Sequence, residues 1–556
     1  MFCHKCGANI AEGAVFCHKC GTPFESAVAT KTEETMEPPN QQEESPIADT
    51  PRRGIKLPRI PKKVLLFGVP AVLVVVLAVV IGAVLSQSHY VMEKGSVYIL
   101  QADDRVIITT ARGNTTTING YYNTQAIADY LVASLDGTKA AALIGEEPYV
   151  YRNAKPSDLY YITNKPHLIA SDVRGYTLAA LGSAVAYSNA AGELWLYDGK
   201  KATQISSDWN SYVLSPDGKA VLYSSEDDRM YLWNGKKTLI GSDLEPVAVS
   251  SGSKYIYFMK DDFLHVQKGL NDSTREKLGD DIDLMYFNQD MSQVIFEYNE
   301  RACLSRNGGS RQPLSGKFEG IVLPESAALV YYNLYDYGNS GRYTGVFGHD
   351  WQNSGYGYVY VLGVADFKNT LYFNGDDAVV RINSRYEAES VAKNIESYDI
   401  SLSEDGKTLA YLKNDRLYRM NVLDANAEPL LVNDEKIYDF KATYDGGATY
   451  YVNYDSEIYF QKSTSKPVSV VFDKIYNWGM FKNNSLYYIS GGDLYVSSGD
   501  KGKMVRGIDG KVIDFYMAPS AIRLWANDGD DILHYRSTDG KIFNLMYREI
   551  NAANRY

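Results

Sequence analysis

The chain has 556 residues and a formal net charge of −12, with 68 acidic and 56 basic side chains. It is long enough for several domains, and its acidic balance argues against a protein whose main task is to bind nucleic acid, since such proteins carry basic patches or stripes. Four of its five cysteines lie in the first twenty residues, which excludes a disulfide-rich scaffold over the rest of the chain.

The N-terminal residues contain two Cys-x-x-Cys pairs, each followed by glycine. The first pair is Cys3 and Cys6, and the second is Cys17 and Cys20. Such turns direct both sulfurs at one metal ion, and four thiolates complete the tetrahedral shell that zinc takes. Two disulfides or a redox pair are compatible with the cysteine count, but the near-duplicate pairs favour zinc. We predict a structural zinc ribbon over residues 1–24, stabilised by its metal because so short a segment cannot form a hydrophobic core.

His4 and His18 occupy equivalent positions inside the two pairs, and we expect both to be exposed because four thiolates already complete the site. Residues 2–24 resemble the short zinc-ribbon domains at the N-termini of many bacterial and archaeal membrane proteins. Zinc ribbons can bind nucleic acid, but this one has Lys5 and Lys19 and no arginine. A small protein-contact module is therefore the favoured interpretation.

A linker and an apolar segment follow the zinc ribbon. Residues 25–63 are rich in Glu, Pro, Gln and Thr and poor in aromatic side chains, which predicts a disordered linker with a basic end. Residues 64–85 contain no charged side chain and cover about 33 Å as a helix, which predicts a transmembrane span. Basic residues crowd the N-terminal flank, which places the N-terminus in the cytoplasm and the C-terminal region outside the cell membrane. They are Arg52, Arg53, Lys56, Arg59, Lys62 and Lys63.

The region from residue 90 to the C-terminus is built from repeats. The segments that begin at Leu214, Leu402 and Ala442 share an Asp-Gly turn, an alternating apolar strand with tyrosine, and further strands separated by polar turns. A spacing of about 34 to 40 residues with about four short strands per unit is typical of β-propeller blades. Weaker copies begin near Leu135, Leu181, Ser250, Asn288, Ala327, Asp366, Phe481 and Met517.

The segments LSPDGK and LSEDGK resemble the turns of TolB-type and WD40-like propeller repeats, in which Ser-x-Asp-Gly precedes a strand. The resemblance implies a mainly β fold but no single function, since such propellers serve as binding platforms, parts of peptidases and periplasmic scaffolds. About eleven or twelve units are visible, whereas single propellers usually have four to eight blades. We therefore expect either two propellers, over residues 90–325 and 326–556, or one large propeller.

One unit departs from the repeat. Residues 335–363 form an additional stretch rich in glycine and aromatic residues, and they carry His349, Asp350 and Trp351 side by side. Loops at the ends of strands commonly hold binding residues, so this insertion is a candidate contact surface. An extended hairpin packed over the channel of the propeller is the structural alternative.

No motif of a known catalytic centre is present. The sequence lacks a GxSxG nucleophile, an HExxH motif, a Walker loop and a dinucleotide-binding glycine pattern. We expect the acidic pairs Asp227–Asp228 and Asp261–Asp262 and the segment 527–531 to be strand-connecting turns, and the last lacks the full calcium-loop pattern. Cys303 is expected to be a small buried strand residue. The exported histidines, at His89, His167, His265, His349 and His534, show no ligand spacing.

The sequence thus predicts a single-pass membrane protein that is not an enzyme. Its outer propeller is expected to bind a protein or a cell-envelope ligand, while the cytoplasmic zinc ribbon contacts a protein partner, as in a scaffold or a receptor-like sensor. No nucleic acid is expected. Two alternatives stay open: a surface enzyme acting on cell-envelope glycans or peptides, and a regulator that binds nucleic acid through the zinc ribbon.

Overall fold

The computed structural model describes residues 97–552 with gaps, the longest being 120–130, 145–156, 345–357 and 505–513. The chain divides into two compact units, Met1–Leu77 and Ala78–Tyr556, and every described strand belongs to the second. The predicted zinc ribbon, linker and span at 64–85 lie outside the described residues. Within the described residues, no helix is long and apolar enough to cross a membrane.

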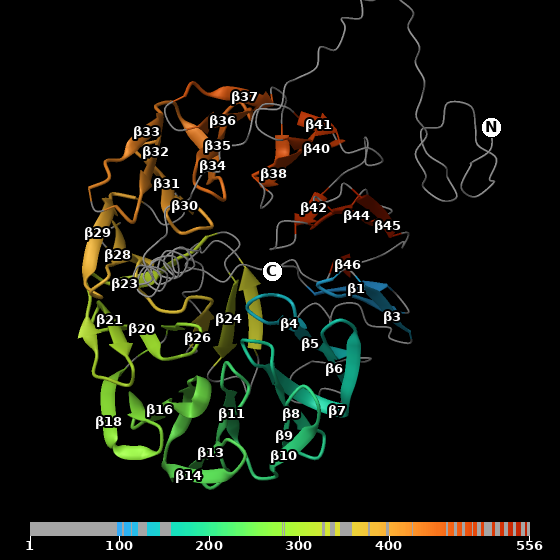
Figure 1. The fold of residues 1–556 in the computed structure, drawn as a ribbon, viewed down its shortest axis with the longest axis vertical. Helices are drawn as coiled ribbons and strands as arrows, with labels where there is room; N and C mark the ends of the chain where they lie inside the picture. Colours follow the sequence, from blue (N-terminus) through green and yellow to red (C-terminus); the bar gives the residue numbers. More distant parts are fainter. Residues whose placement is uncertain are drawn as a thin grey trace, which may run out of the picture. The chain divides into compact units, whose positions relative to one another are not determined.

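The helices and strands among the described residues are all β-strands, apart from one 3-10 turn, η2 (Ser251–Ser253), which confirms the prediction of a mainly β fold. The strands make ten sheets, eight of four strands and two of seven (Figure 1). The first sheet has the order β3 (Thr115–Asn119), β2 (Arg105–Thr109), β1 (Tyr98–Ala102) and β46 (Asn551–Ala552). The second has the order β10 (Ala202–Ser206), β9 (Leu194–Tyr197), β8 (Val185–Asn189), β7 (Pro166–Leu178), β6 (Ser157–Ile162), β5 (Ala140–Ile144) and β4 (Leu131–Ala133).

The next three sheets follow in chain order. One contains β11 (Ser211–Leu214), β12 (Val221–Ser224), β13 (Arg229–Trp233) and β14 (Lys237–Ser242). Another contains β15 (Glu245–Val249), β16 (Tyr255–Lys260), β17 (Phe263–Lys268) and β18 (Asn271–Asp280). The second seven-stranded sheet has the order β22 (Gln312–Pro313), β21 (Arg301–Arg306), β20 (Gln293–Tyr298), β19 (Leu284–Phe287), β26 (Tyr358–Leu362), β24 (Ala328–Asn333) and β25 (Ser340–Thr344).

Five four-stranded sheets complete the unit. Two contain β23 (Phe318–Val322), β27 (Leu371–Asn374), β28 (Ala378–Ile382) and β29 (Ala388–Lys393), then β30 (Ile400–Leu402), β31 (Thr408–Lys413), β32 (Arg416–Asn421) and β33 (Leu430–Asn433). The next has β34 (Ile437–Ala442), β35 (Ala448–Asn453), β36 (Ile458–Lys462) and β37 (Val468–Val471). The last two have β38 (Ile475–Met480), β39 (Leu486–Ser490), β40 (Asp493–Ser497) and β41 (Gly502–Met504), then β42 (Asp514–Met517), β43 (Arg523–Asn527), β44 (Ile532–Arg536) and β45 (Lys541–Leu545).

The recurring unit is a meander of four antiparallel strands. The first seven-stranded sheet contains two such units joined by the 13-residue strand β7, which pairs with β6 through its first part and with β8 through its last. The first and the last described strands lie in one sheet, because β46 pairs with β1 at Leu100–Ala552 and Gln101–Asn551. Figure 1 shows this final strand beside β1.

Apolar side chains pack neighbouring sheets together. Val106 and Ile108 of β2 share a buried cluster with Ala140 and Ala142 of β5, and comparable clusters lie between the later sheets. Central strands read as nearly continuous apolar runs because both of their faces are covered, and Leu371–Asn374 is buried at every position. The packing of sheet on sheet therefore supplies the core.

The Ser-x-Asp-Gly turns join the first and second strands of several sheets. In the turn after β30, the hydroxyl of Ser403 donates to Asp405 at 2.7 Å, and it accepts from the amide of Thr408 at 2.9 Å. Asp405 accepts from the amide of Lys407 at 3.1 Å. Thr443 and Asp445 repeat this arrangement after β34. The turn residues thus satisfy one another locally, which explains why the motif recurs with the strand period.

Candidate functional site

The predicted metal ligands Cys3, Cys6, Cys17 and Cys20 lie outside the described residues. Within the described residues, no group of three His, Cys, Asp or Glu side chains is arranged to hold a metal ion. The described histidines lie on different sheets, with His167 on β7, His265 on β17 and His534 on β44.

The strands β24, β25 and β26 are inserted between β23 and β27, which pair directly with each other. β24 pairs antiparallel with both β25 and β26. β26 pairs in parallel with β19, with Leu284 opposite Tyr358 and Phe287 opposite Val361. β25 lies against β4 and β7. The insertion therefore extends one sheet beyond β19 toward β4, the edge strand of another sheet.

This insertion overlaps the stretch 335–363 that the sequence singled out. Its last strand, β26, is buried from Val359 to Leu362 and contributes to two hydrophobic clusters. The side chains of His349, Asp350 and Trp351 lie in segment 345–357, outside the described residues. Within the described residues, the insertion is joined to β19 through a parallel strand pair that no other sheet of the described region contains.

Arginine side chains reach from one sheet to backbone carbonyls of the next. Arg275 on β18 donates to the carbonyl of Ile240 on β14 at 3.1 Å, and Arg311, before β22, donates to that of Leu278 on β18 at 2.6 Å. The guanidinium of Arg311 also lies over the ring of Tyr298, 3.9 Å from its centroid. Charge-assisted bonds of this kind are stronger than neutral ones, so these arginines fix the spacing of adjacent sheets.

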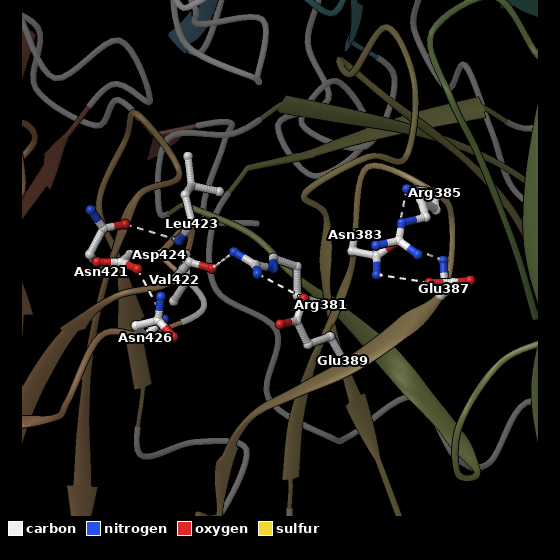
Figure 2. Close-up of polar contacts among 10 residues, drawn as sticks. All are labelled: Arg381, Asn383, Arg385, Glu387, Glu389, Asn421, Val422, Leu423, Asp424 and Asn426. Carbon is white, nitrogen blue, oxygen red and sulfur yellow. Dashed lines mark hydrogen bonds and ion pairs between the residues drawn. The ribbon is translucent and has the colours of Figure 1, made fainter.

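Arg381 on β28 makes the most buried of these connections. Figure 2 shows its guanidinium between the carbonyl of Val422, to which Nη1 donates, and the carboxylate of Glu389, 2.8 Å from Nη2. Nε of Arg381 is buried and has no hydrogen-bond partner among the described residues. Asn421 orders the segment that carries Val422, because its side-chain oxygen accepts from the amide of Leu423 at 2.9 Å.

Arg419 on β32 is also buried, opposite Ala410. Burial lowers the pKa of its guanidinium, while the charge of Asp445 acts in the opposite direction. Its Nη1 lacks a hydrogen-bond partner among the described residues, as do Oγ1 of Thr449 and Oε1 of Gln461, which face each other on β35 and β36. These three atoms, on the neighbouring sheets β30–β33 and β34–β37, are therefore buried polar atoms without a partner among the described residues.

The acidic pairs occupy strand-connecting turns, as predicted. Asp227 accepts a hydrogen bond from Ser225 in the turn between β12 and β13, where Asp228 has a φ of 57°. Asp261 and Asp262 form the turn between β16 and β17, with φ values of 50° and 63°. Aspartate tolerates this left-handed conformation better than most residues, which explains its presence at both sites. Of the segment 527–531, only Asn527 is described, at the end of β43.

Cys303 is a free, buried residue of β21 opposite Phe296, as predicted from the sequence. Burial raises the pKa of its thiol, and the nearby charge of Arg311 only partly opposes this effect. A thiol in this environment is a poor nucleophile. Cys303 therefore belongs to the core.

The sequence interpretation missed the functional potential of one exposed pair, Tyr438 and Tyr454. Their exposed fractions are 71% and 67%, and their rings meet edge to face with centroids 6.0 Å apart. The chain has 46 tyrosines, and the strand pattern of the sequence does not distinguish those that are buried from those that are exposed. Only the backbone geometry around β34 distinguishes this pair from buried tyrosines such as Tyr450.

Comparison with known proteins identifies the N-terminal segment. Residues 2–24 match the zinc-ribbon domain family. The chain carries a zinc-ribbon domain at its N-terminus. A search of curated proteins finds no match to the chain. The paired Cys-x-x-Cys turns of the sequence are thus explained by a known domain.

Proposed function

We propose that this protein is a membrane-anchored binding scaffold without enzymatic activity. Residues 64–85 span the membrane, the zinc ribbon contacts a protein in the cytoplasm, and the strand region binds a protein or an envelope ligand outside. The basic flank before the span supports this orientation. Cys3, Cys6, Cys17 and Cys20 would hold a structural Zn²⁺, and their chemistry fits that ion because four thiolates close its coordination shell.

We propose further that the strand region is one large β-propeller. Three observations support this: the repeated four-stranded meanders, the apolar packing of neighbouring sheets from β1–β3 through β38–β41, and the pairing of β46 with β1. A division near residue 325 would separate β23 from β27, which are paired strands of one sheet. One propeller is therefore favoured over two.

The inserted strands β24–β26 carry the proposal of a binding role. In a repeat protein, each unit mainly supports its neighbours, so the element that departs from the repeat is the natural place for a specific contact. Within the described residues, β26 of the insertion pairs with β19, and β25 approaches β4. Binding residues commonly lie on loops that are positioned by a rigid scaffold of strands or helices.

The test uses the full-length protein in its native membranes. A photo-crosslinking residue placed at Trp351 is expected to capture one saturable envelope partner, and replacement of residues 345–357 by a short Gly-Ser linker is expected to abolish that partner's retention. A crosslinker at the exposed Leu270, in the turn between β17 and β18, serves as the control position. Cleavage of a wall polymer by the purified protein, or equal capture at both positions, would contradict the proposal.

A further inference from the structure

The Tyr438–Tyr454 pair lies at one end of the sheet β34–β37. A β-bulge between Ile437 and Asp439 places Tyr438 there, and Tyr454 directly follows Asn453, the residue opposite Ile437. Both residues are largely exposed, yet their rings contact each other at an interplanar angle of 78°. Single exposed aromatic residues need no explanation, but a paired set this exposed is typical of a contact surface.

Carboxylates gather at the same end of the sheet. Asp455 and Glu457 lie in the turn that follows Tyr454, and Glu435 precedes β34. Glu457 accepts from the hydroxyl of Tyr459 at 2.7 Å. That hydrogen bond is the first cause of the raised pKa of Tyr459, about 12, and the charges of Glu435 and Asp455 act in the same direction. Glu435, Asp455 and Glu457 therefore all lie near enough to Tyr459 to raise the pKa of its hydroxyl.

Lys436, the residue after Glu435, is already paired with another carboxylate. Lys436 lies 3.5 Å from Asp415, a residue of the turn between β31 and β32, and both side chains are largely exposed. Within the described residues, neither Glu435 nor Asp455 forms an ion pair with a lysine or an arginine. The rim of the aromatic pair is thus negative.

We propose that the Tyr438–Tyr454 pair, with Glu435 and Asp455, is a docking surface for a lysine- or arginine-bearing segment of a protein partner. A cation over a tyrosine face is attracted by the ring, and nearby carboxylates strengthen that attraction. Acidic segments and anionic polymers are repelled by the same rim. The inference rests on the proposed binding role and names the chemistry of the partner, at a surface separate from β24–β26.

The experiment uses the full-length protein in lipid nanodiscs and a defined probe. The probe is a fluorescent twelve-residue peptide with four arginines spaced by glycine and serine, and its matched control carries citrulline, which is neutral, in place of arginine. Binding is followed by fluorescence anisotropy at low and physiological salt. Because the whole protein is acidic, it attracts the arginine peptide non-specifically. Only binding that is lost when the two tyrosines are replaced therefore supports the docking surface.

The double substitution Tyr438→Ala and Tyr454→Ala is expected to weaken arginine-peptide binding roughly tenfold. Tyr438→Phe with Tyr454→Phe keeps the ring faces and should retain most of the affinity. Leu239→Ala with Leu270→Ala, at exposed positions on β14 and in the turn between β17 and β18, should leave binding unchanged. Glu435→Gln with Asp455→Asn should weaken binding and flatten its dependence on salt. Unchanged thermal midpoints show that each variant is folded.

Two results would overturn the docking surface. Equal binding of the arginine peptide by wild type and the double alanine variant would show that the rings are not used. Tyrosine-dependent binding of the citrulline peptide, or competition by a neutral oligosaccharide, would assign the rings to an uncharged ligand instead. Neither result bears on crosslinking at Trp351, so the failure of this inference and the failure of the proposed function are distinguishable.

Discussion

Arg381 joins two neighbouring sheets by donating from Nη1 to the carbonyl of Val422 while Nη2 pairs with Glu389 at 2.8 Å. Its side chain is only 7% exposed, so both contacts are made largely out of water. A guanidinium suits this position because its fixed fork can serve a carbonyl and a carboxylate at once. The contact between these two sheets is therefore polar and specific as well as apolar.

Substitution Arg381→Met should lower the stability of the strand region by about 2 kcal/mol, because it leaves the Val422 carbonyl and the Glu389 carboxylate without their donor. Glu389→Gln keeps an acceptor oxygen for Nη2, and its side chain is partly exposed, so a smaller loss is expected. Urea unfolding followed by tyrosine fluorescence measures both. An Arg381→Met variant as stable as wild type would show that the contact between the sheets is maintained by apolar packing alone.

Gly218 shows why the Ser-x-Asp-Gly turn needs glycine. Its φ is +67°, and an added Cβ would lie 2.5 Å from Cβ of Ala184 and 2.6 Å from Oγ of Ser183, both outside its own sheet of β11–β14. Gly252 has a similar φ of +69° with open space around it. Gly252→Ala should cost about 1 kcal/mol for the left-handed conformation, and Gly218→Ala at least about 2 kcal/mol because the clash is added. Equal unfolding midpoints for the two variants would contradict this account.

The local pattern of the sequence predicts the strands and turns well, because period-two alternation and Asp-Gly turns are local properties. It fails where the partner of a strand is distant. The spacing marks a repeat near Ala327, but the strands after it form no sheet of their own, and β26 pairs in parallel with β19. Local periodicity carries no information about such a pairing.

The polar contacts between sheets were also not predictable. Arg381 and Arg419 each stand among apolar strand residues, which is unusual, but the partner of Arg381 on the neighbouring sheet is a backbone carbonyl and leaves no mark on the sequence. The exposure of Tyr438 depends on a bulge at one end of β34. The zinc ribbon is the opposite case, because four cysteines at fixed spacing define the domain without any structure.

The turn carboxylates make stability depend on pH. Burial alone would raise the pKa of Asp136, but hydrogen bonds from Ser134 and Thr138 outweigh it and hold that pKa below its usual value. The folded state therefore binds fewer protons than the unfolded state, so this stabilisation is present above about pH 4 and is lost as the pH falls through the folded pKa. In thermal melts from pH 6 to pH 2, wild type should be more stable than Asp136→Asn at pH 6, and the difference should shrink toward pH 2. A pH-independent difference would argue against the assignment.

Cys303 should resist alkylation while the protein is folded. Its side chain is buried and burial raises the pKa of its thiol, so the thiolate that reacts with iodoacetamide is both scarce and shielded. Mass spectrometry of the peptide that contains Cys303 separates its reaction from that of the N-terminal cysteines. Labelling should rise in parallel with urea unfolding, and rapid labelling without denaturant would place the residue at a surface. The Cys303→Ala variant, which has no thiol at this position, is the negative control for labelling.

The zinc-ribbon domain and the strand region should be stable independently of each other, because the chain divides into separate compact units at Leu77. Cys3→Ser with Cys17→Ser removes one ligand from each pair, so zinc measured in the purified protein should fall from one ion per chain to near zero. His4→Ala with His18→Ala, inside the same pairs, should leave the zinc content unchanged. The unfolding midpoint of the strand region should stay the same in all variants. Full zinc content in the cysteine variant would mean that other side chains hold the ion, and loss in the histidine variant would make those residues ligands.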